Sequence, residues 1–153
     1  MAPRDDLPRE KNRKLLYQRS DKLRRAEQLG DTHPHRPARA LAEGERMNVL
    51  FVCSRNQWRS PTAERVFRHH PLMAVRSAGT SPSARRPLGE ADLRWADAAL
   101  VMEPKHRERI LAAHPRLAEH ACIHVLDIPD DYRFMDPELV EMLEAMVPVL
   151  LFG

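Results

Sequence analysis

The sequence predicts an α/β fold in three layers, with a four-stranded parallel sheet between two layers of helices. Short apolar runs alternate four times with helix-like segments between residues 48 and 146. The first run, residues 49–52, is continuous and rich in β-branched and aromatic side chains, which is typical of a strand buried on both faces. Because strands that alternate with helices are joined by right-handed crossovers, this order predicts a parallel sheet.

The expected elements follow one another in regular alternation. Strands are predicted at residues 49–52, 72–75, 98–102 and 123–126, and helices at residues 62–70, 88–95, 104–114 and 138–146. Ser60 is expected to cap the first helix, with Pro61 at its first position. The last helix is expected to begin in the same way, with Asp136 as the cap and Pro137 after it.

Residues 1–46 differ in charge from the rest of the chain. They carry 12 Lys/Arg and 8 Asp/Glu, whereas residues 47–153 carry 13 and 14. We predict a basic, flexible N-terminal extension, with a weakly amphipathic helix over residues 8–29 and a linker over residues 30–46, followed by one domain at residues 47–153. The extension is either merely solvated, with the domain proper starting at Met47, or an arm for an acidic partner or nucleic acid. The domain itself is not basic, so nucleic-acid binding by it is not expected.

The composition predicts a cytoplasmic protein without a membrane partner. No apolar run approaches the roughly 20 residues that span a bilayer, and the N-terminus lacks the apolar core of a secretory signal. The two cysteines, Cys53 and Cys122, are too few for a disulfide framework. A reducing compartment suits this cysteine content.

The stretch CSRNQWRSP, residues 53–61, joins the end of the first strand to the start of a helix. Backbone N–H groups that lead into a helix N-terminus bind anions, and the fork of Arg59 can hold two oxygens of a tetrahedral oxyanion. The same positive potential stabilises a thiolate at Cys53, which is then a nucleophile aimed at the bound anion. The alternative is a buried structural cysteine, but a Cys and an Arg at the two ends of one such loop favour phosphoryl transfer.

This stretch resembles the Cys-x5-Arg-Ser loop of the low-molecular-weight protein tyrosine phosphatases, and residues 77–80, SAGT, resemble an element after that family's second strand. The resemblance covers about residues 47–147 and implies the same fold, with strand order 2-1-3-4. Two positions depart from the family pattern. Arg55 stands where a small residue is usual, and Trp58 stands where many members have a second, protective cysteine. The region between the second and third strands is also shorter than usual, which leaves the physiological substrate open.

The resemblance implies a phosphomonoester hydrolase that acts through a phosphocysteine intermediate on a phosphotyrosine protein or a small phosphomonoester. Cys53 would attack phosphorus, Arg59 would bind its oxygens, and Ser60 would assist the thiolate. The general acid is expected in the loop after the fourth strand, where Asp127 is favoured over Asp130. Phosphate or sulfate is expected to bind in the loop, and no metal or organic cofactor is expected. Further substrate or phosphate contacts are expected from Ser54, Arg55, Asn56, Gln57, Trp58 and Tyr132.

Two other functions remain open from the sequence. Some arsenate reductases share this fold and loop, but they pass oxidation along further cysteines, and only Cys122 is available here. A phosphate-binding or phosphopeptide-binding module that has lost turnover is the second alternative, because Arg55 and Trp58 depart from the family pattern. The eight histidines show no metal-ligand spacing, and the Gly-rich nucleotide loops are absent from the sequence.

Overall fold

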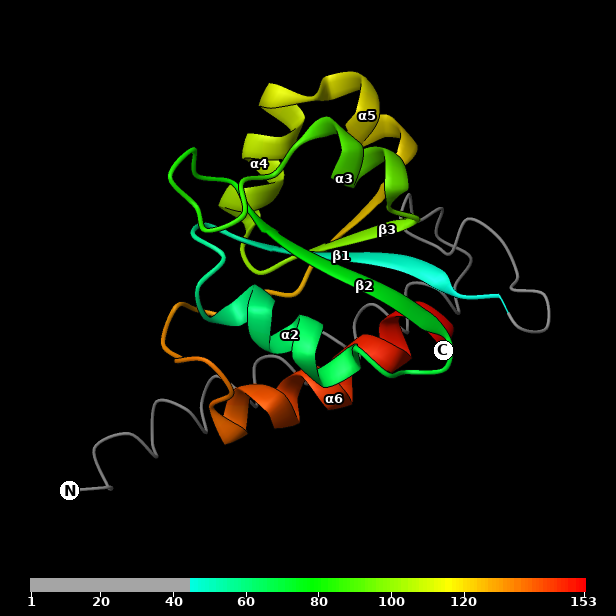
Figure 1. The fold of residues 1–153 in the computed structure, drawn as a ribbon, viewed down its shortest axis with the longest axis vertical. Helices are drawn as coiled ribbons and strands as arrows, with labels where there is room; N and C mark the ends of the chain where they lie inside the picture. The colour runs from blue at the N-terminus through cyan, green and yellow to red at the C-terminus, as the bar shows by residue number, and fades with distance from the viewer. Residues whose placement is uncertain (1–44) are drawn as a thin grey trace, which may run out of the picture.

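The computed structural model describes residues 45–153 (Figure 1). The predicted helix at residues 8–29 and nearly all of the predicted linker and extension lie outside the described residues. In the described part of the chain, no helix is both long and apolar enough to cross a membrane.

Four parallel strands form one sheet in the order β2-β1-β3-β4, which confirms the predicted fold class and strand order. The strands are β1 (Met47–Cys53), β2 (Met73–Gly79), β3 (Ala98–Val101) and β4 (Cys122–Val125). β1 lies between β2 and β3, so Val49 is in register with Val75 on one side and Ala98 on the other. All the carboxyl ends therefore meet at one edge of the sheet, where ligands bind in open α/β folds.

Helices cover both faces of the sheet (Figure 1). One face is covered by α2 (Arg59–Phe67) and α6 (Pro137–Phe152), and the other by α3 (Glu90–Trp95), α4 (Pro104–Ala113) and α5 (Pro115–His120).

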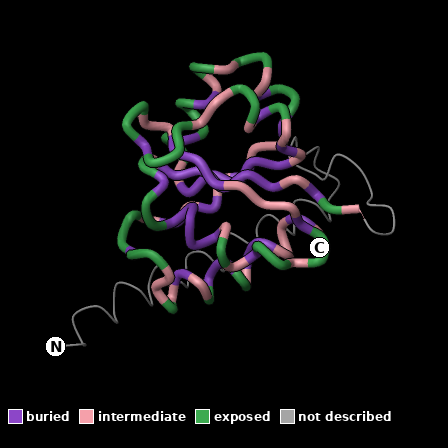
Figure 2. Tube along the Cα trace, in the orientation of Figure 1, coloured by how far each residue is buried: buried purple, intermediate pink, exposed green. Residues whose placement is uncertain are grey.

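The apolar run in β1 serves both hydrophobic cores. Val49 and Phe51 pack with α2 and α6, whereas Leu50 and Val52 pack with α3, α4 and α5. Successive side chains of a strand point to opposite faces, so a strand covered on both faces must be apolar at every position. Figure 2 shows this strand as part of the buried centre of the molecule.

The start of the first helix differs from the prediction. α2 begins at Arg59, its N-cap is Trp58, and no side chain caps it, so the prediction that Ser60 is the cap is wrong. The Ser60 hydroxyl lies against Cys53 instead. The last helix does begin as predicted, because the Asp136 carboxylate accepts a hydrogen bond from the Glu138 N–H.

Two helical segments were missed. Residues 115–120 form α5, which carries little apolar sequence but buries Ala118 against the core beside α3. α6 continues past the predicted end at residue 146 to Phe152, although Pro148 lies inside it. Val147 and Leu151 are fully or almost fully buried, and this burial outweighs the one helical N–H that proline lacks.

Gly79 brings the end of β2 close to residues 53–59, called here the Cys53 loop. It is the last residue of β2. A Cβ atom at this position would lie 2.6 Å from the Ser54 carbonyl oxygen and 2.6 Å from the Ala84 Cβ. The missing side chain therefore permits the close approach of two backbones.

A Gly79→Ser variant should lower the free energy of unfolding by about 1–3 kcal/mol, because the new Cβ forces the Cys53 loop and the Ala84 segment apart. Urea denaturation measures this change. Gly89→Ser is the matched control, since a Cβ at Gly89 meets nothing within 4 Å. Equal stability of the two variants would contradict the prediction.

Candidate functional site

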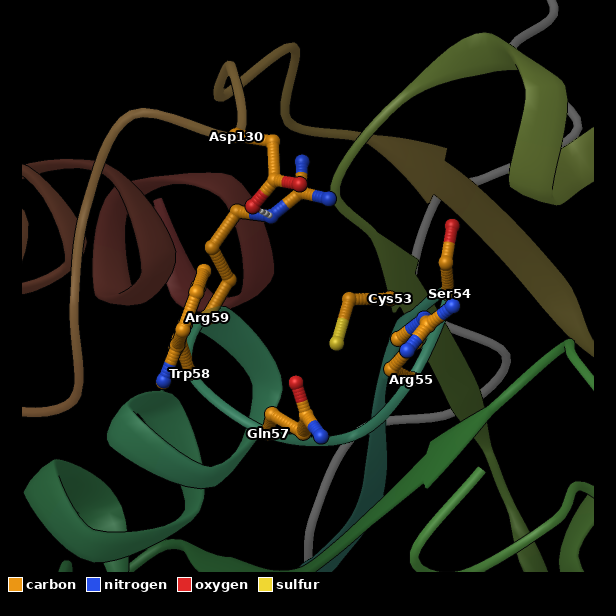
Figure 3. A pocket seen from close by; sticks show the side chains of 7 residues that line it. All are labelled: Cys53, Ser54, Arg55, Gln57, Trp58, Arg59 and Asp130. Carbon is orange, nitrogen blue, oxygen red and sulfur yellow. Dashed lines mark ion pairs between the residues drawn. The ribbon is translucent and has the colours of Figure 1, made fainter. Parts of the chain in front are cut away.

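A pocket of about 260 Å³ lies at the carboxyl edge of the sheet, between the Cys53 loop and the loop after β4 (Figure 3). Its lining residues are Cys53, Ser54, Arg55, Gln57, Trp58, Arg59 and Asp130. The volume is slightly below the roughly 300–1,000 Å³ of sites for drug-sized ligands, so the pocket suits a small group or one side chain of a larger partner.

Cys53 is 4% exposed, and its sulfur lies at the base of this pocket. Its Sγ is 2.9 Å from the Ser60 Oγ, which accepts a hydrogen bond of 2.9 Å from the Asn56 Nδ2. The Ser60 hydroxyl proton can therefore point to the sulfur, and its other acceptor, the Ala78 carbonyl oxygen, is more distant at 3.5 Å. Asn56 has φ 56°, a left-handed conformation that asparagine tolerates well. The Ser60 hydroxyl, in the first turn of α2, is thus directed at the position of a thiolate.

Arg59 is 2% exposed and is held by groups that follow two other strands. Its Nη1 donates to the Glu103 Oε1 at 2.5 Å and to the Ile128 carbonyl oxygen at 2.8 Å, while its Nε lies 3.5 Å from the Asp130 Oδ1 (Figure 3). A buried guanidinium needs such partners to offset its desolvation. Nη1 is thus fixed inside the protein, and the Nε side of the Arg59 guanidinium faces Asp130 in the pocket.

Asp130, rather than Asp127, shares the pocket with Cys53 and Arg59. Asp127 is half-buried and has φ 62°, so the chain changes direction there, and the next residue, Ile128, is buried in the core. The Asp130 side chain is 59% exposed and lies over the pocket. The geometry therefore favours Asp130, contrary to the order that we expected from nearness to the strand end.

Four of the six residues predicted to contact phosphate or substrate line the pocket, namely Ser54, Arg55, Gln57 and Trp58. Trp58 is 38% exposed, and the Arg133 guanidinium carbon lies 5.4 Å from the centre of its ring. The tryptophan therefore presents an aromatic surface at the edge of the pocket.

The side chains of the other two lie elsewhere. Tyr132 is 1% exposed and belongs to the core between the sheet, α2 and α6, so the prediction that it forms a wall of the pocket is wrong. Ile128 is buried in the same core, which indicates that the loop is anchored by its apolar residues. The side chain of Asn56 is buried beneath the loop, where it supports Ser60.

Sequence reasoning missed three residues that follow β3. Besides Glu103, they are His106, which is fully buried, and Arg109. His106 Nδ1 accepts a hydrogen bond of 3.0 Å from the Glu103 N–H, so its proton is on Nε2, which donates to the Ser54 Oγ at 2.9 Å. Arg109 Nη1 lies 3.4 Å from the same Ser54 oxygen. The sequence feature that could have identified them is their position shortly after a predicted parallel strand, because ligands bind at the carboxyl edge of such a sheet.

His106 is held in its neutral form. Burial lowers the pKa of His106 to about 3, and the nearby cations Arg59, Lys105 and Arg109 act in the same direction, while Asp130 partly opposes them. A neutral imidazole can both accept from Glu103 and donate to Ser54, whereas the charged ring would lose its acceptor. In residues 45–153, no group of three or more His, Cys, Asp or Glu side chains is arranged to hold a metal ion.

The low pKa of His106 predicts acid sensitivity. Between pH 6.5 and about 3 the unfolded chain takes up a proton at this histidine and the native protein does not, so the free energy of unfolding should fall as the pH falls through this range. A His106→Asn variant should show a shallower fall in urea denaturation at a series of pH values, whatever its stability at pH 7. His69→Asn, at an exposed histidine, is the control and should keep the wild-type slope. An unchanged slope for His106→Asn would contradict this account.

Comparison with known proteins agrees with the geometry. A family model described as low molecular weight phosphotyrosine protein phosphatase matches residues 48–91. The chain is 32% identical over 115 residues to the low molecular weight protein-tyrosine-phosphatase Wzb of Escherichia coli K12, an alignment that covers 56% of this chain and 78% of Wzb.

Solved structures share the fold. The tyrosine phosphatase Wzb from Escherichia coli K30, in complex with sulphate, is 24% identical with a TM-score of 0.51, over 67% of this chain and 92% of that chain. The YwlE arginine phosphatase from Geobacillus stearothermophilus is 20% identical with a TM-score of 0.52, over 68% and 88%. At this level of identity the two structures support the architecture alone. The sequence match to Wzb of strain K12 shows more than the architecture: this chain belongs to the low-molecular-weight protein tyrosine phosphatase family.

Proposed function

We propose that the protein hydrolyses phosphomonoesters through a phosphocysteine intermediate, and that its substrate group is phosphotyrosine. The observation that carries this proposal is the position of the Cys53 sulfur, at the base of a pocket whose wall contains Arg59 and Asp130. A nucleophile, an oxyanion-binding cation and a proton donor are the three groups that the reaction requires.

In the first step the Cys53 thiolate attacks phosphorus. The S–P bond forms as the bond from phosphorus to the leaving oxygen breaks, and that oxygen takes a proton from the Asp130 carboxyl. Backbone N–H groups of residues 54–59 and the Nε side of Arg59 stabilise the equatorial oxygens. Ser60 stabilises the thiolate before attack through the contact of 2.9 Å.

The contact between Arg59 and Asp130 links substrate binding to acid catalysis. A phosphoryl group bound at the Arg59 Nε competes with the carboxylate, which lies 3.5 Å away, and leaves Asp130 available to the leaving oxygen. In the second step Asp130 takes a proton from water, which attacks phosphorus. The P–S bond then breaks, and the products are inorganic phosphate and the Cys53 thiolate.

The walls of the pocket favour an aromatic phosphoester. Trp58 offers a ring face to a phenyl group, and aromatic pairs of this kind add about 0.5–1.5 kcal/mol beyond the area that they bury. Arg55 lines the same pocket, and Arg133 lies over Trp58. These cations repel a guanidinium leaving group, so the pocket suits phosphotyrosine better than phosphoarginine.

The position of Cys122 argues against an arsenate reductase. Cys122 starts β4, in register with Ala98 and Val49, whereas Cys53 ends β1 four residues further along a parallel strand. The two cysteines are therefore about 13 Å apart along the strand direction alone, too far for a disulfide without rearrangement. Burial also raises the pKa of the Cys122 thiol. A thiolate nucleophile without a nearby resolving thiol fits a reducing compartment, and we place the protein in the cytoplasm.

Hydrolysis of p-nitrophenyl phosphate by the full-length protein, in the presence of a chelator, tests the proposal. Wild type should be active, and Cys53→Ser should lose all measurable turnover, because serine is not ionised at neutral pH. Rapid quenching of wild type with radiolabelled substrate should trap an acid-stable phosphoprotein. A folded wild-type protein without turnover would refute the proposed reaction.

The assignment of the acid has its own test. Asp130→Asn should lower kcat by about 10²- to 10⁴-fold. The loss should be larger for phenyl phosphate than for p-nitrophenyl phosphate, because nitrophenolate leaves more easily without a proton. Asp131→Asn, one residue away and exposed, is the matched control. A loss dependent on the leaving group in Asp127→Asn, but not in Asp130→Asn, would reverse the assignment.

A further inference from the structure

A second pocket, of about 400 Å³, lies beside the Cys53 pocket and shares Gln57 with it. We call it the arginine pocket, after the four arginines in its lining: Arg65, Arg68, Arg85 and Arg86. Glu64 and Phe134 also line it. The proposed reaction uses none of these residues.

The arginine pocket is built from two segments that the fold brings together. Arg65 lies in the last turn of α2, and Arg68 is the C-cap residue, where the backbone is still helical. Both are exposed, and their spacing of three residues places them on one side of the helix end. Arg85 and Arg86 follow β2. Arg85 is attached to the Cys53 loop, because its Nε donates to the Asn56 carbonyl oxygen at 3.0 Å and its backbone N–H donates to the Arg55 carbonyl oxygen at 3.0 Å. The position of the arginine pocket relative to the Cys53 pocket is therefore well defined.

The pocket concentrates positive charge. Its single acidic lining residue, Glu64, accepts a short hydrogen bond of 2.5 Å from the Ser77 hydroxyl. Among the described residues, none of the four arginines forms an ion pair with a carboxylate. Residues 45–153 carry 14 Lys/Arg and 15 Asp/Glu, so this basic surface belongs to a domain with a net negative charge. Such local concentration attracts anionic ligands.

We propose that the arginine pocket binds a second anionic group of the same phosphorylated polypeptide whose phosphotyrosine enters the Cys53 pocket. This inference rests on the proposed function. Guanidinium forks bind carboxylates and phosphates in the same bidentate way, so the group is an acidic side chain or a second phosphoryl group. Because the two pockets share Gln57, it lies roughly two to four extended residues from the phosphotyrosine.

Two further features favour a separate acidic polypeptide. Residues 1–44 of this chain carry 11 Lys/Arg and 7 Asp/Glu, so the same-sign charge makes them a poor occupant of a basic pocket. Phe134 is 47% exposed at the arginine pocket, where its ring can contact an apolar side chain of the bound segment.

The test is steady-state kinetics on matched phosphotyrosine peptides. One peptide has alanines around the phosphotyrosine, one has glutamates two to four residues away on each side, and one has a second phosphotyrosine there. For wild type, kcat/KM should be about tenfold higher for the glutamate peptide than for the alanine peptide at low salt, and the ratio should shrink as salt rises. The doubly phosphorylated peptide shows which anion is preferred. Equal kcat/KM for all three peptides would overturn the inference.

Two double variants show whether the preference comes from this pocket. Arg65→Glu with Arg68→Glu should abolish the preference for the glutamate peptide. Arg107→Glu with Arg116→Glu makes the same charge change on α4 and α5, on the opposite face of the sheet (Figure 1), and should keep it. Loss in both double variants, or in neither, would overturn the assignment to the arginine pocket.

A binding measurement separates this inference from the proposed reaction. Fluorescence anisotropy with labelled peptides and Cys53→Ser requires no turnover, and the glutamate peptide should bind about tenfold more tightly than the alanine peptide. If wild type hydrolyses neither peptide nor p-nitrophenyl phosphate, the proposed function fails, but the anisotropy still tests the pocket. Stronger competition by an oligodeoxynucleotide than by the glutamate peptide would overturn the inference in favour of nucleic acid.

Discussion

The buried positive charge of Arg59 is the constraint on which the site depends. Arg59 is 2% exposed, and a buried guanidinium must be surrounded by acceptors. Here these come from Glu103 after β3 and from Ile128 and Asp130 after β4. One side chain therefore ties the Cys53 loop to the ends of two other strands. The parallel sheet makes this possible, because it places all these strand ends at one edge.

A second set of contacts, made of hydrogen bonds, fixes individual atoms of the Cys53 loop. Asn56 donates to Ser60 beneath the loop, which leaves the serine proton for the Cys53 sulfur. On the side of α4, neutral His106 donates to Ser54, and its ring is fixed by the Glu103 backbone. The loop thus reaches its geometry before any substrate binds, which is the preorganisation that electrostatic catalysis requires.

The sequence predicts least well those features for which one side chain has two alternative positions. Ser60 has the chemistry of a helix cap, but its hydroxyl lies 2.9 Å from the Cys53 sulfur instead. Tyr132 was predicted to contact the substrate, but burial of its ring in the apolar core stabilises the fold more than exposure in a loop would. Asp127 is nearest to the strand end, yet its left-handed turn leaves Asp130 over the pocket. In each case the residue type indicated what the side chain can do, but the sequence did not indicate in which direction it points.

The resemblance of the sequence to a known family implied the strand order, whereas the residues themselves determined the parallel sheet and the loop that carries Cys53 and Arg59. These follow from local periodicity and from a motif within nine consecutive residues, so no distant contact is needed to recognise them. Only the tertiary structure decided which acidic residue shares the pocket, and that Glu103 and His106 support the loop from about 50 residues away. It also brought the arginines at the end of α2 beside those that follow β2. Contacts between distant segments depend on how the strand ends converge in space, and spacing along the chain does not encode that convergence.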